Sequence, residues 1–413
     1  MKTAAKLLIL PTPEQIILFW KSAGTRRWAY NYFLNRNQEN YQIYLDNGKT
    51  GRSYLSGFDV RKEITALKKT EEFKWLKEVG SNVVKQAVKD AEKALKSFFE
   101  GKTGYPKFKS RHNTDPSFYV NYESLSRKEG GFNGEKLGFV KLIESLPKLK
   151  AGCHYSNPHI SYDGKYWYLG IGWDTEDLES TSKEKTESLS LTGESVGIDL
   201  GIKELAVVYS KYSKQQKFYG NINKTKEVKR LKKKLKREQR KVSRKLRNNT
   251  DHYETVQRSG RKAGNKPVWK RPLRECENIQ KQNKKINLIN KRLTHIRDNH
   301  LHQVTTEIVK AKPSRIVIED LNVKGLMKNK HLAEKLAEQK LGTFKVFIQY
   351  KAERRGIEIV KADRYYPSSK RCSCCGHKKD DLRLSDRVYK CESCGLEIDR
   401  DLNAAINLAN YVI

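Results

Sequence analysis

Four cysteines near the C-terminal end constrain the fold of this chain more than any other feature of its sequence. They form two pairs, each with two residues inside the pair and a glycine after it, and 15 residues separate the pairs: Cys372, Cys375, Cys391 and Cys394. Thiolates at these spacings can close a tetrahedral Zn²⁺ site, and glycine permits the tight turns that such a site needs. The pattern predicts one structural zinc, with no ligand position left open for catalysis.

The other cysteines and the apolar residues indicate a protein that is not exported. Cys374, Cys153 and Cys276 stand outside the ligand pattern, and we interpret them as structural thiols. No apolar run approaches the roughly 20 residues of a membrane-spanning helix. Lys6 interrupts the apolar N-terminal stretch and Pro11 ends it, which favours a short strand over an export signal. We therefore expect a cytoplasmic protein without a membrane partner, whose cysteines are thiols or metal ligands.

The charge of the chain indicates a polyanionic partner. The 413 residues include 84 Lys and Arg against 48 Asp and Glu, a formal net charge of +36. Such a surface attracts phosphate backbones. Residues 221–250 hold 14 Lys and Arg and only two Glu around a thin apolar seam, and residues 278–310 carry a comparable seam. This pattern favours a helical hairpin that grips a backbone over one that is merely solvated. We expect the polar insert at 248–272 to be disordered without RNA.

Hydrophobic periodicity gives a coarse order of elements. It predicts a strand over 1–10, helical stretches over 12–47 and 58–100, β-like segments at 138–143 and 166–171, and a polar linker within 173–192. Aromatic residues recur at helical spacing in the first helical stretch, which favours core packing over base stacking: Trp20, Trp28, Tyr30 and Tyr32.

Three carboxylates occur in apolar surroundings on three separate elements. Asp199 lies in the strand-like sequence GIDLG, Glu319 ends the apolar run RIVIED, and Asp399 and Asp401 open a helix in the sequence DRDLNAA. An acid inside an apolar strand is costly unless a cation neutralises it. We expect the glycines beside Asp199 to leave room for a phosphate backbone.

The order of these elements predicts an RNase H-like domain. A strand with Asp, two further strands, a helix, a strand with Glu and a late helix with Asp follow one another along the chain. That fold gathers carboxylates around two Mg²⁺ ions, which activate water and stabilise the leaving 3′ oxygen in phosphodiester hydrolysis.

The motifs closely resemble those of a known family. The segments GIDLGI at 197–202, IEDLNVKG at 318–325 and DRDLNAA at 399–405, together with the CxxCG pairs, resemble the RuvC motifs and zinc ribbon of TnpB. TnpB proteins are encoded by insertion sequences and are related to type V CRISPR effectors. Three further segments resemble the family's N-terminal region, so that the resemblance covers nearly the whole chain: PTPEQ at 11–15, WAYN at 28–31 and GYPKFKSR at 104–111.

The resemblance implies an RNA-guided, Mg²⁺-dependent DNA endonuclease. Such a protein binds a guide RNA transcribed from the transposon end, reads a short motif beside its double-stranded DNA target, and cuts both strands in one RuvC site. Asp199, Glu319 and Asp401 would be the catalytic carboxylates that hold two Mg²⁺ ions, and Asp401 matches the motif better than Asp399. One protein would act with each guide RNA, in the cytoplasm and on the nucleoid.

The resemblance also implies nucleic-acid contacts and a domain layout. SNVVKQ at 81–86 resembles the helix that reads the adjacent motif. The implied contact residues are Lys85, Gln86, Lys107, Lys109 and Arg111. The expected α/β architecture has a β-barrel-like wedge domain (1–10 and 102–180), an inserted helical recognition domain (11–101), a linker (181–192), an RNase H-like RuvC domain (193–370 and 396–413) and an inserted zinc ribbon (371–395).

Other functions stay open. A nuclease-inactive RNA-guided repressor would share every basic feature but should lack one of the three acids, and this chain keeps all three. An RNase H-like transposase is a second alternative. A zinc-ribbon nucleic-acid-binding protein without catalysis would leave Asp199 and Glu319 unexplained. A miniature CRISPR effector descended from TnpB is a further possibility.

Overall fold

The chain forms two compact units, Met1–Lys183 and Glu184–Ile413, in a computed structural model. The structure describes residues 2–111, 114–178, 191–258, 261–383 and 386–412. Most of the predicted linker at 181–192 lies outside the described residues.

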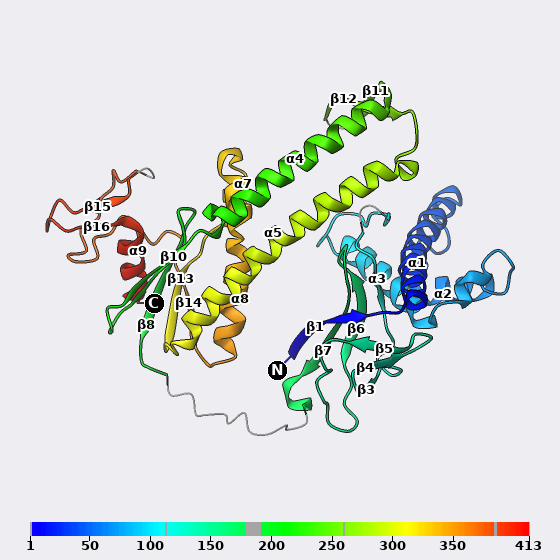
Figure 1. Ribbon diagram of the computed structural model, residues 1–413, viewed down its shortest axis with the longest axis horizontal. Coiled ribbons are helices and arrows are strands. Elements are labelled where there is room, and N and C mark those ends of the chain that lie inside the picture. Colours follow the sequence, from blue (N-terminus) through cyan, green and yellow to red (C-terminus); the bar gives the residue numbers. More distant parts are fainter. Residues whose placement is uncertain (1, 112–113, 179–190, 259–260, 384–385, 413) are drawn as a thin grey trace. The chain divides into compact units, whose positions relative to one another are not determined.

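The first unit contains a seven-stranded antiparallel sheet in the order β2-β6-β7-β1-β5-β4-β3 (Figure 1). Its strands are β1 (Lys2–Leu10), β2 (Ser117–Tyr119), β3 (Ser126–Lys128), β4 (Gly131–Gly134), β5 (Gly138–Leu142), β6 (Ser156–Tyr162) and β7 (Trp167–Asp174). The predicted strands at 1–10, 138–143 and 166–171 are confirmed. β1 pairs with β7 along most of its length and with β5 near its end.

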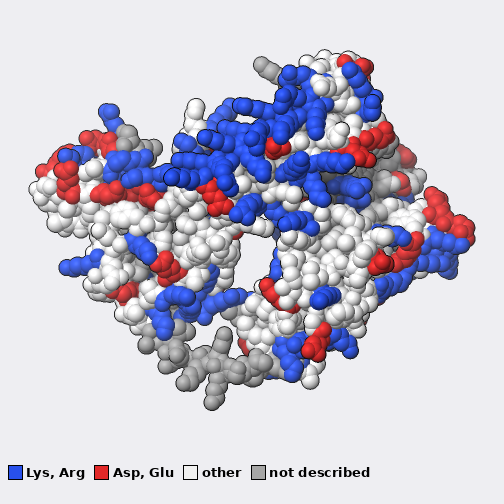
Figure 2. Space-filling view, in the orientation of Figure 1, with Lys and Arg blue, Asp and Glu red and all other residues white. Residues whose placement is uncertain are grey.

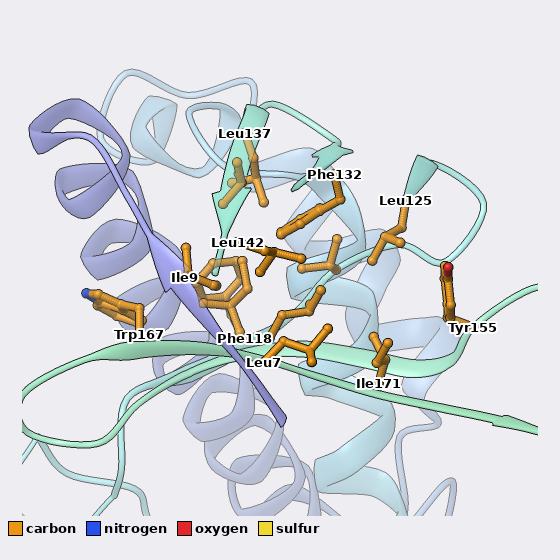
Figure 3. Packing of buried hydrophobic residues seen from close by; sticks show 14 of the residues in the cluster. Leu7, Ile9, Phe118, Leu125, Phe132, Leu137, Leu142, Tyr155, Trp167 and Ile171 are labelled. Carbon is orange, nitrogen blue, oxygen red and sulfur yellow. The ribbon is translucent and has the colours of Figure 1, made fainter. Parts of the chain in front are cut away.

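Alternating apolar residues of these strands form the core of the sheet. Figure 3 shows Leu7 and Ile9 of β1 beside Phe118, Phe132 and Leu142, which come from three other strands. Burying side chains of this size contributes roughly 1.5–3 kcal/mol each.

The described part of the first unit also contains three α-helices: α1 (Pro13–Asp46), α2 (Gly57–Leu67) and α3 (Ser81–Phe99). Thr12 and Gln15 form a capping box, and the Gln15 Nε2 also donates to the carbonyls of Leu137 and Phe139 at 3.1 and 2.7 Å. The start of α1 is thereby fixed to the turn between β4 and β5. Packing is confirmed as a role of the α1 aromatics: Tyr30 is buried, and Trp28 stacks on Tyr32.

The expectation of one helical stretch over 58–100 is wrong. The chain leaves helical structure after α2 and forms a 3-10 turn, η1 (Lys74–Lys77), before α3 begins. Leu76 in this turn is fully buried in the core that α1, α2 and α3 share. Burial of Leu76 therefore holds the chain in a reversal that periodicity alone does not reveal.

The second unit is built on a five-stranded mixed sheet in the order β10-β9-β8-β13-β14. Its strands are β8 (Ser195–Leu200), β9 (Glu204–Ser210), β10 (Gln216–Gly220), β13 (Arg315–Glu319) and β14 (Glu358–Ala362). β8, β9 and β10 are antiparallel neighbours, whereas β13 lies parallel to both β8 and β14. Two short helices, α6 (Val323–Leu326) and α7 (Lys330–Gln339), follow β13.

Helices cover both faces of this sheet. On one face Ile198 and Ile318 pack in a core with residues of α5 (Glu277–Lys310) and α8 (Leu341–Glu353). On the other face α9 (Arg400–Ala409) packs on Val317 of β13 through Leu408, and on Val207 of β9 through Leu402. Side chains alternate along a strand, so residues 197, 199, 317 and 319 belong to the α9 face.

Gly197 allows α9 to approach the sheet. A Cβ at this position would lie 2.1 Å from the carbonyl oxygen of Ala405 and 2.3 Å from the backbone nitrogen of Ala409. The expectation that both glycines beside Asp199 leave room for a phosphate backbone is therefore wrong at Gly197, because the helix already fills that space. At Gly201 a Cβ would lie 3.2 Å from the carbonyl oxygen of Glu204, a neighbour in the chain.

The basic segments form a long helical hairpin, as predicted. α4 (Lys226–Asn249) packs against α5 through a thin apolar seam that includes Val228, Ile289 and Leu293. Glu238 and Gln282 are buried across the same interface and form a hydrogen bond.

The expectation of disorder in the insert at 248–272 is wrong. Its described residues form an antiparallel hairpin of β11 (Thr250–Arg258) and β12 (Arg261–Trp269). The segment is polar, yet pairing of the two strands satisfies the backbone without a core. Among the described residues no helix is both long and apolar enough to span a membrane.

The packing at Gly197 predicts a large effect of a single methyl group. Gly197→Ala should destabilise the second unit by about 1–3 kcal/mol or more, because backbone atoms of α9 would have to move. Thermal or denaturant unfolding measures the change. Gly342→Ala is the matched control: Gly342 lies in α8 with open space around its Cα, so stability should be unchanged or higher by up to about 1 kcal/mol. Equal stability of the two variants would contradict this account of Gly197.

Candidate metal centres

The four predicted cysteines come together at one point of the second unit. Their sulfur atoms all lie within 4.8 Å of one another, with 3.6 Å between Cys372 and Cys394 and 3.5 Å between Cys375 and Cys391. A tetrahedral zinc with Zn–S bonds of about 2.3 Å would separate its sulfurs by about 3.8 Å. The cluster therefore fits a structural zinc. The exposed Cys374 stands outside it.

Two tight turns shape the cysteine cluster. Gly376 and Gly395 adopt φ of 79° and 72°, a region that favours glycine, and their N–H groups donate to the carbonyls of Cys372 and Cys391. The backbone N–H of His377 lowers the pKa of Cys375 to about 6, which favours the thiolate that binds metal. The short strands β15 (Val388–Lys390) and β16 (Glu397–Asp399) pair beneath the cluster, where Tyr389 is fully buried.

Strand register places two of the three predicted carboxylates next to each other. Ile198 of β8 pairs with Ile318 of the parallel strand β13, so that Asp199 and Glu319 occupy the next position of their strands on the α9 face. Asp401 lies in the first turn of α9, which packs on the same face.

Electrostatic effects on Asp199 indicate that the carboxylates are neighbours. Burial raises the pKa of Asp199 well above its usual value, and the negative charges of Glu319 and Asp401 raise it further, against the opposing effect of Arg400. Within the described ranges no residue donates a hydrogen bond to the Asp199 carboxylate or forms an ion pair with it. Arg400 offsets only part of the cost of ionising Asp199, so that a bound cation would supply the remaining compensation.

Protein groups contact the other acids. Ser368 donates through Oγ to Glu319, and Arg400 pairs with Asp401 at 3.0 Å. Asp399 caps α9 by accepting from the backbone nitrogens of Asp401 and Leu402 at 2.9 and 3.2 Å, so that its Oδ1 is occupied.

The carboxylate oxygens do not form a group as tight as that of the cysteine sulfurs. Among the described residues the four cysteines are the one group of three or more candidate ligands whose atoms lie within 4.8 Å of each other.

Sequence reasoning missed three residues that join the two centres. Asn403 and Asn407, one turn apart on α9, are buried. Both donate to the carbonyl of Arg371 at 2.7 and 2.6 Å, just before the first cysteine pair. Asn407 also donates at 2.7 Å to the carbonyl of Ser368, the residue that contacts Glu319. Two amides four residues apart, among the apolar residues that follow Asp401 in α9, were the available signal.

The predicted nucleic-acid-binding residues lie in the first unit and face different surroundings. Lys85 is exposed and Gln86 is half-buried on α3, where both line a cavity of about 570 Å³. Gln86 donates to Asp90 at 2.8 Å. Lys107 and Arg111 are exposed in a loop.

Lys109 points inward instead. Its Nζ lies 3.6 Å from the centre of the Tyr30 ring, and its backbone N–H and carbonyl both bond the Asn31 amide. Burial, together with the charge of Arg26, lowers the pKa of Lys109 to about 8. These contacts give Lys109 a packing role in addition to any contact with nucleic acid.

Comparison with known proteins identifies relatives along the chain. Three family models match it: "Helix-turn-helix domain" of the OrfB_IS605 type at 1–44, "Probable transposase" at 179–330, and "Cas12f1-like, TNB domain" at 342–408. A Streptomyces pristinaespiralis protein described as a candidate RNA-guided DNA endonuclease is 28% identical over 409 residues, which cover 99% of this chain and 89% of that protein.

Two further relatives agree. InsQ of Escherichia coli K12, which carries the same description, is 26% identical over 422 residues, with 98% of this chain and 91% of InsQ covered. The TnpB-like protein L79 of Acanthamoeba polyphaga mimivirus is 32% identical over 151 residues, which cover 35% of this chain and 28% of that protein.

The fold and the cysteine cluster define a mixed α/β protein with a C-terminal TNB domain, which is a zinc-ribbon type. With the relatives just described, the chain belongs to the TnpB/IS605 OrfB family, which is related to the Cas12f RNA-guided endonucleases. The predicted resemblance is confirmed.

The cysteine cluster predicts one zinc ion per chain. Cys391→Ser should lose the ion and lower the melting temperature, because a structural zinc contributes directly to folding. Metal analysis and thermal unfolding with and without chelator measure both effects. Cys374→Ser is the matched control, since this exposed thiol lies outside the cluster and should keep the zinc. Absence of zinc from wild-type protein purified without chelator would refute the prediction.

The raised pKa of Asp199 predicts a pH-dependent cost of folding in the absence of metal. In the unfolded chain Asp ionises near pH 3.9, whereas in the folded chain its pKa is higher, so the wild type loses stability as pH rises above about 4. Asp199→Asn should therefore melt higher than wild type at neutral pH, and the difference should vanish in acid.

Divalent cations should offset the loss of stability that the ionised Asp199 carboxylate causes. Mg²⁺ or Mn²⁺ should raise the melting temperature of the wild type more than that of Asp199→Asn. Glu358→Gln changes an exposed acid of β14 in the same sheet and should behave as wild type. If Asp199→Asn melts lower than wild type at neutral pH without metal, the ionised Asp199 carboxylate does not destabilise the fold and the prediction is wrong.

Proposed function

We propose that this protein is an RNA-guided DNA endonuclease. In this proposal it binds a guide RNA from the transposon end, reads a short motif beside a double-stranded DNA target, and hydrolyses phosphodiester bonds of both strands in one site. The observation that carries the proposal is the carboxylate set on the α9 face: Asp199 and Glu319 on adjacent parallel strands, with Asp401 in the packed helix. The relatives' descriptions support the same activity.

The topology of the second unit supports an RNase H-like assignment. Three antiparallel strands are followed by two strands parallel to the first, and the order is β10-β9-β8-β13-β14. Asp199 lies in β8, the first of these strands along the chain, and Glu319 lies in β13, the fourth. We assign 193–370 and 396–413 to this RuvC domain and 371–395 to the zinc ribbon.

The three carboxylates fit a site for divalent cations. They are hard oxygen ligands on one face of the sheet, and Asp199 has no hydrogen-bond or ion-pair partner among the residues that the structure describes. Bound Mg²⁺ would supply an activated water and stabilise the leaving oxygen. Asp199, Glu319 and Asp401 would hold the ions. Ser368 would orient Glu319, and Arg400 would limit the net negative charge that the scissile phosphate meets.

The basic hairpin supports RNA as the large polyanionic partner. Of the 24 residues of α4, 13 are Lys or Arg. Figure 2 shows Lys and Arg side chains crowded along α4 on the face in view. A dense positive charge of this kind binds a phosphate backbone, which suits a partner whose bases pair with the target.

The first unit offers a site for reading the adjacent motif. Lys85 and Gln86 line the cavity of about 570 Å³ together with Asn121. Amide side chains suit the edge of adenine, and lysine suits guanine or phosphate. We assign 11–101 to a recognition domain, and 1–10 with 102–180 to a β-barrel-like wedge domain. One protein would act with one guide.

The decisive experiment exchanges the guide. RNA-free protein is reconstituted with guides of two sequences, and each complex is challenged with both matching targets in Mg²⁺. Cutting should switch with the guide, because base pairing supplies specificity. A transposase or a plain nuclease would instead cut without RNA or ignore the guide, and either result would refute the proposal.

The same complexes locate the site. Asp199→Ala should bind the guided target with near wild-type affinity and cut neither strand, because it removes a metal ligand but no positive charge. Glu358→Ala changes an exposed acid of the same sheet, and this variant should both bind the target and cut it as wild type does. If wild-type protein binds but never cuts under any divalent cation, the repressor is the better assignment.

A further inference from the structure

Tyr365 is the most exposed large aromatic side chain of the described residues. Its exposed fraction is 87%, against 66% for Tyr212, the next most exposed aromatic. A large apolar ring in water loses the stabilisation that burial provides, so an isolated, fully open ring needs an explanation from its surroundings.

The loop that carries this ring is fixed by its neighbours. In residues 363–368, the N–H of Tyr365 donates to the Asp363 carboxylate at 2.7 Å, and the N–H of Tyr366 donates to the Asp363 carbonyl at 3.0 Å. The Tyr366 ring packs edge-on against Tyr411, and its hydroxyl donates to the Asn407 carbonyl at 3.3 Å. The backbone is therefore held in place while the Tyr365 ring stays in solvent.

The same loop contacts Glu319 of the carboxylate site and its neighbour Asp320. Ser368 donates to Glu319, and Arg364 pairs with Asp320 at 2.6 Å, so both acids at the end of β13 are tied to it. Tyr365 and Ser368 are three residues apart, which limits their Cα atoms to a separation of about 11 Å. That span equals about three stacked nucleotides at about 3.4 Å each.

The surroundings of the ring suit a nucleic-acid strand. Arg364 pairs with Asp320 at 2.6 Å, and Lys345 donates to the Leu321 carbonyl at 3.4 Å. Lys361 of β14 lies opposite Ile318 of β13, so that three cations surround the end of β13. A protein partner would need apolar neighbours around an anchoring ring, but the flanking side chains on this side are the exposed Asp363 and Arg364. An aromatic face beside cations is how proteins hold single strands.

We propose that Tyr365 is a stacking platform for an unpaired base of the DNA strand that is held at the carboxylate site. The inference rests on the proposed nuclease function and makes Tyr365 a positioning residue. A paired base is already covered on both faces by its neighbours, so the platform selects a strand that has left the duplex.

The test compares Tyr365→Ala with Tyr365→Phe in the guided complex. Single-turnover cutting by Tyr365→Ala should fall roughly tenfold to a hundredfold, the range expected for loss of one stacked base. Tyr365→Phe keeps the ring and should cut as wild type. Tyr212→Ala is the matched control, because it removes an exposed ring of the same unit at the turn after β9.

A second measurement separates stacking from a general structural effect. In an Asp199→Ala background, which binds without cutting, 2-aminopurine is placed at successive positions around the cut. Its fluorescence at one position should be quenched when Tyr365 is intact or carries the Tyr365→Phe change, because both keep an aromatic ring. The same position should be bright in the Tyr365→Ala complex.

The outcomes distinguish the two proposals. Failure of wild-type protein to cut with a guide refutes the nuclease, not the platform alone. Normal cutting by Tyr365→Ala in a reaction where wild type cuts overturns the platform. So does slower cutting without any change in 2-aminopurine signal.

Discussion

The close approach of α9 to the central sheet is the constraint on which the second unit depends. Gly197 has no Cβ, and the helix backbone occupies the space that a side chain would take. This contact fixes the height of α9 above β8 and β13, and so the position of Asp401 relative to Asp199 and Glu319. The three acids lie on elements far apart in sequence, and their relative positions therefore depend on the distance at which α9 packs on the sheet.

Polar contacts extend this constraint beyond the sheet. Asn403 and Asn407 hold the chain before the first cysteine pair, and Asn407 holds the segment that contacts Glu319. The cysteine cluster and the carboxylates therefore share one helix as a support. In this arrangement a structural metal would influence the carboxylate site without lying in it, because both depend on the same buried amides.

Local patterns predicted much of this architecture. The CxxC spacing brings its ligands together within one short segment, and the apolar strands around Asp199 and Glu319 are visible from composition. The role of Gly197 was not predictable, because it depends on which distant helix docks there. The contact of Ser368 with Glu319 was not predictable either, because it also joins residues that are far apart in the sequence. Near 250–269 the polar composition hid a hairpin whose strands pair without a core, and near Leu76 helical periodicity concealed a turn.

The two ends of the β11–β12 insert are hydrogen-bonded to each other where the insert joins the basic helices. The Asn249 amide donates to the Arg271 carbonyl at 2.8 Å and accepts from the Arg271 N–H at 3.2 Å, so one asparagine joins both ends of the insert. The ends are therefore adjacent, and the two helices meet independently of what lies between them. This junction is a natural port for protein engineering: an effector domain with neighbouring termini could replace the hairpin and leave the seam between α4 and α5 intact.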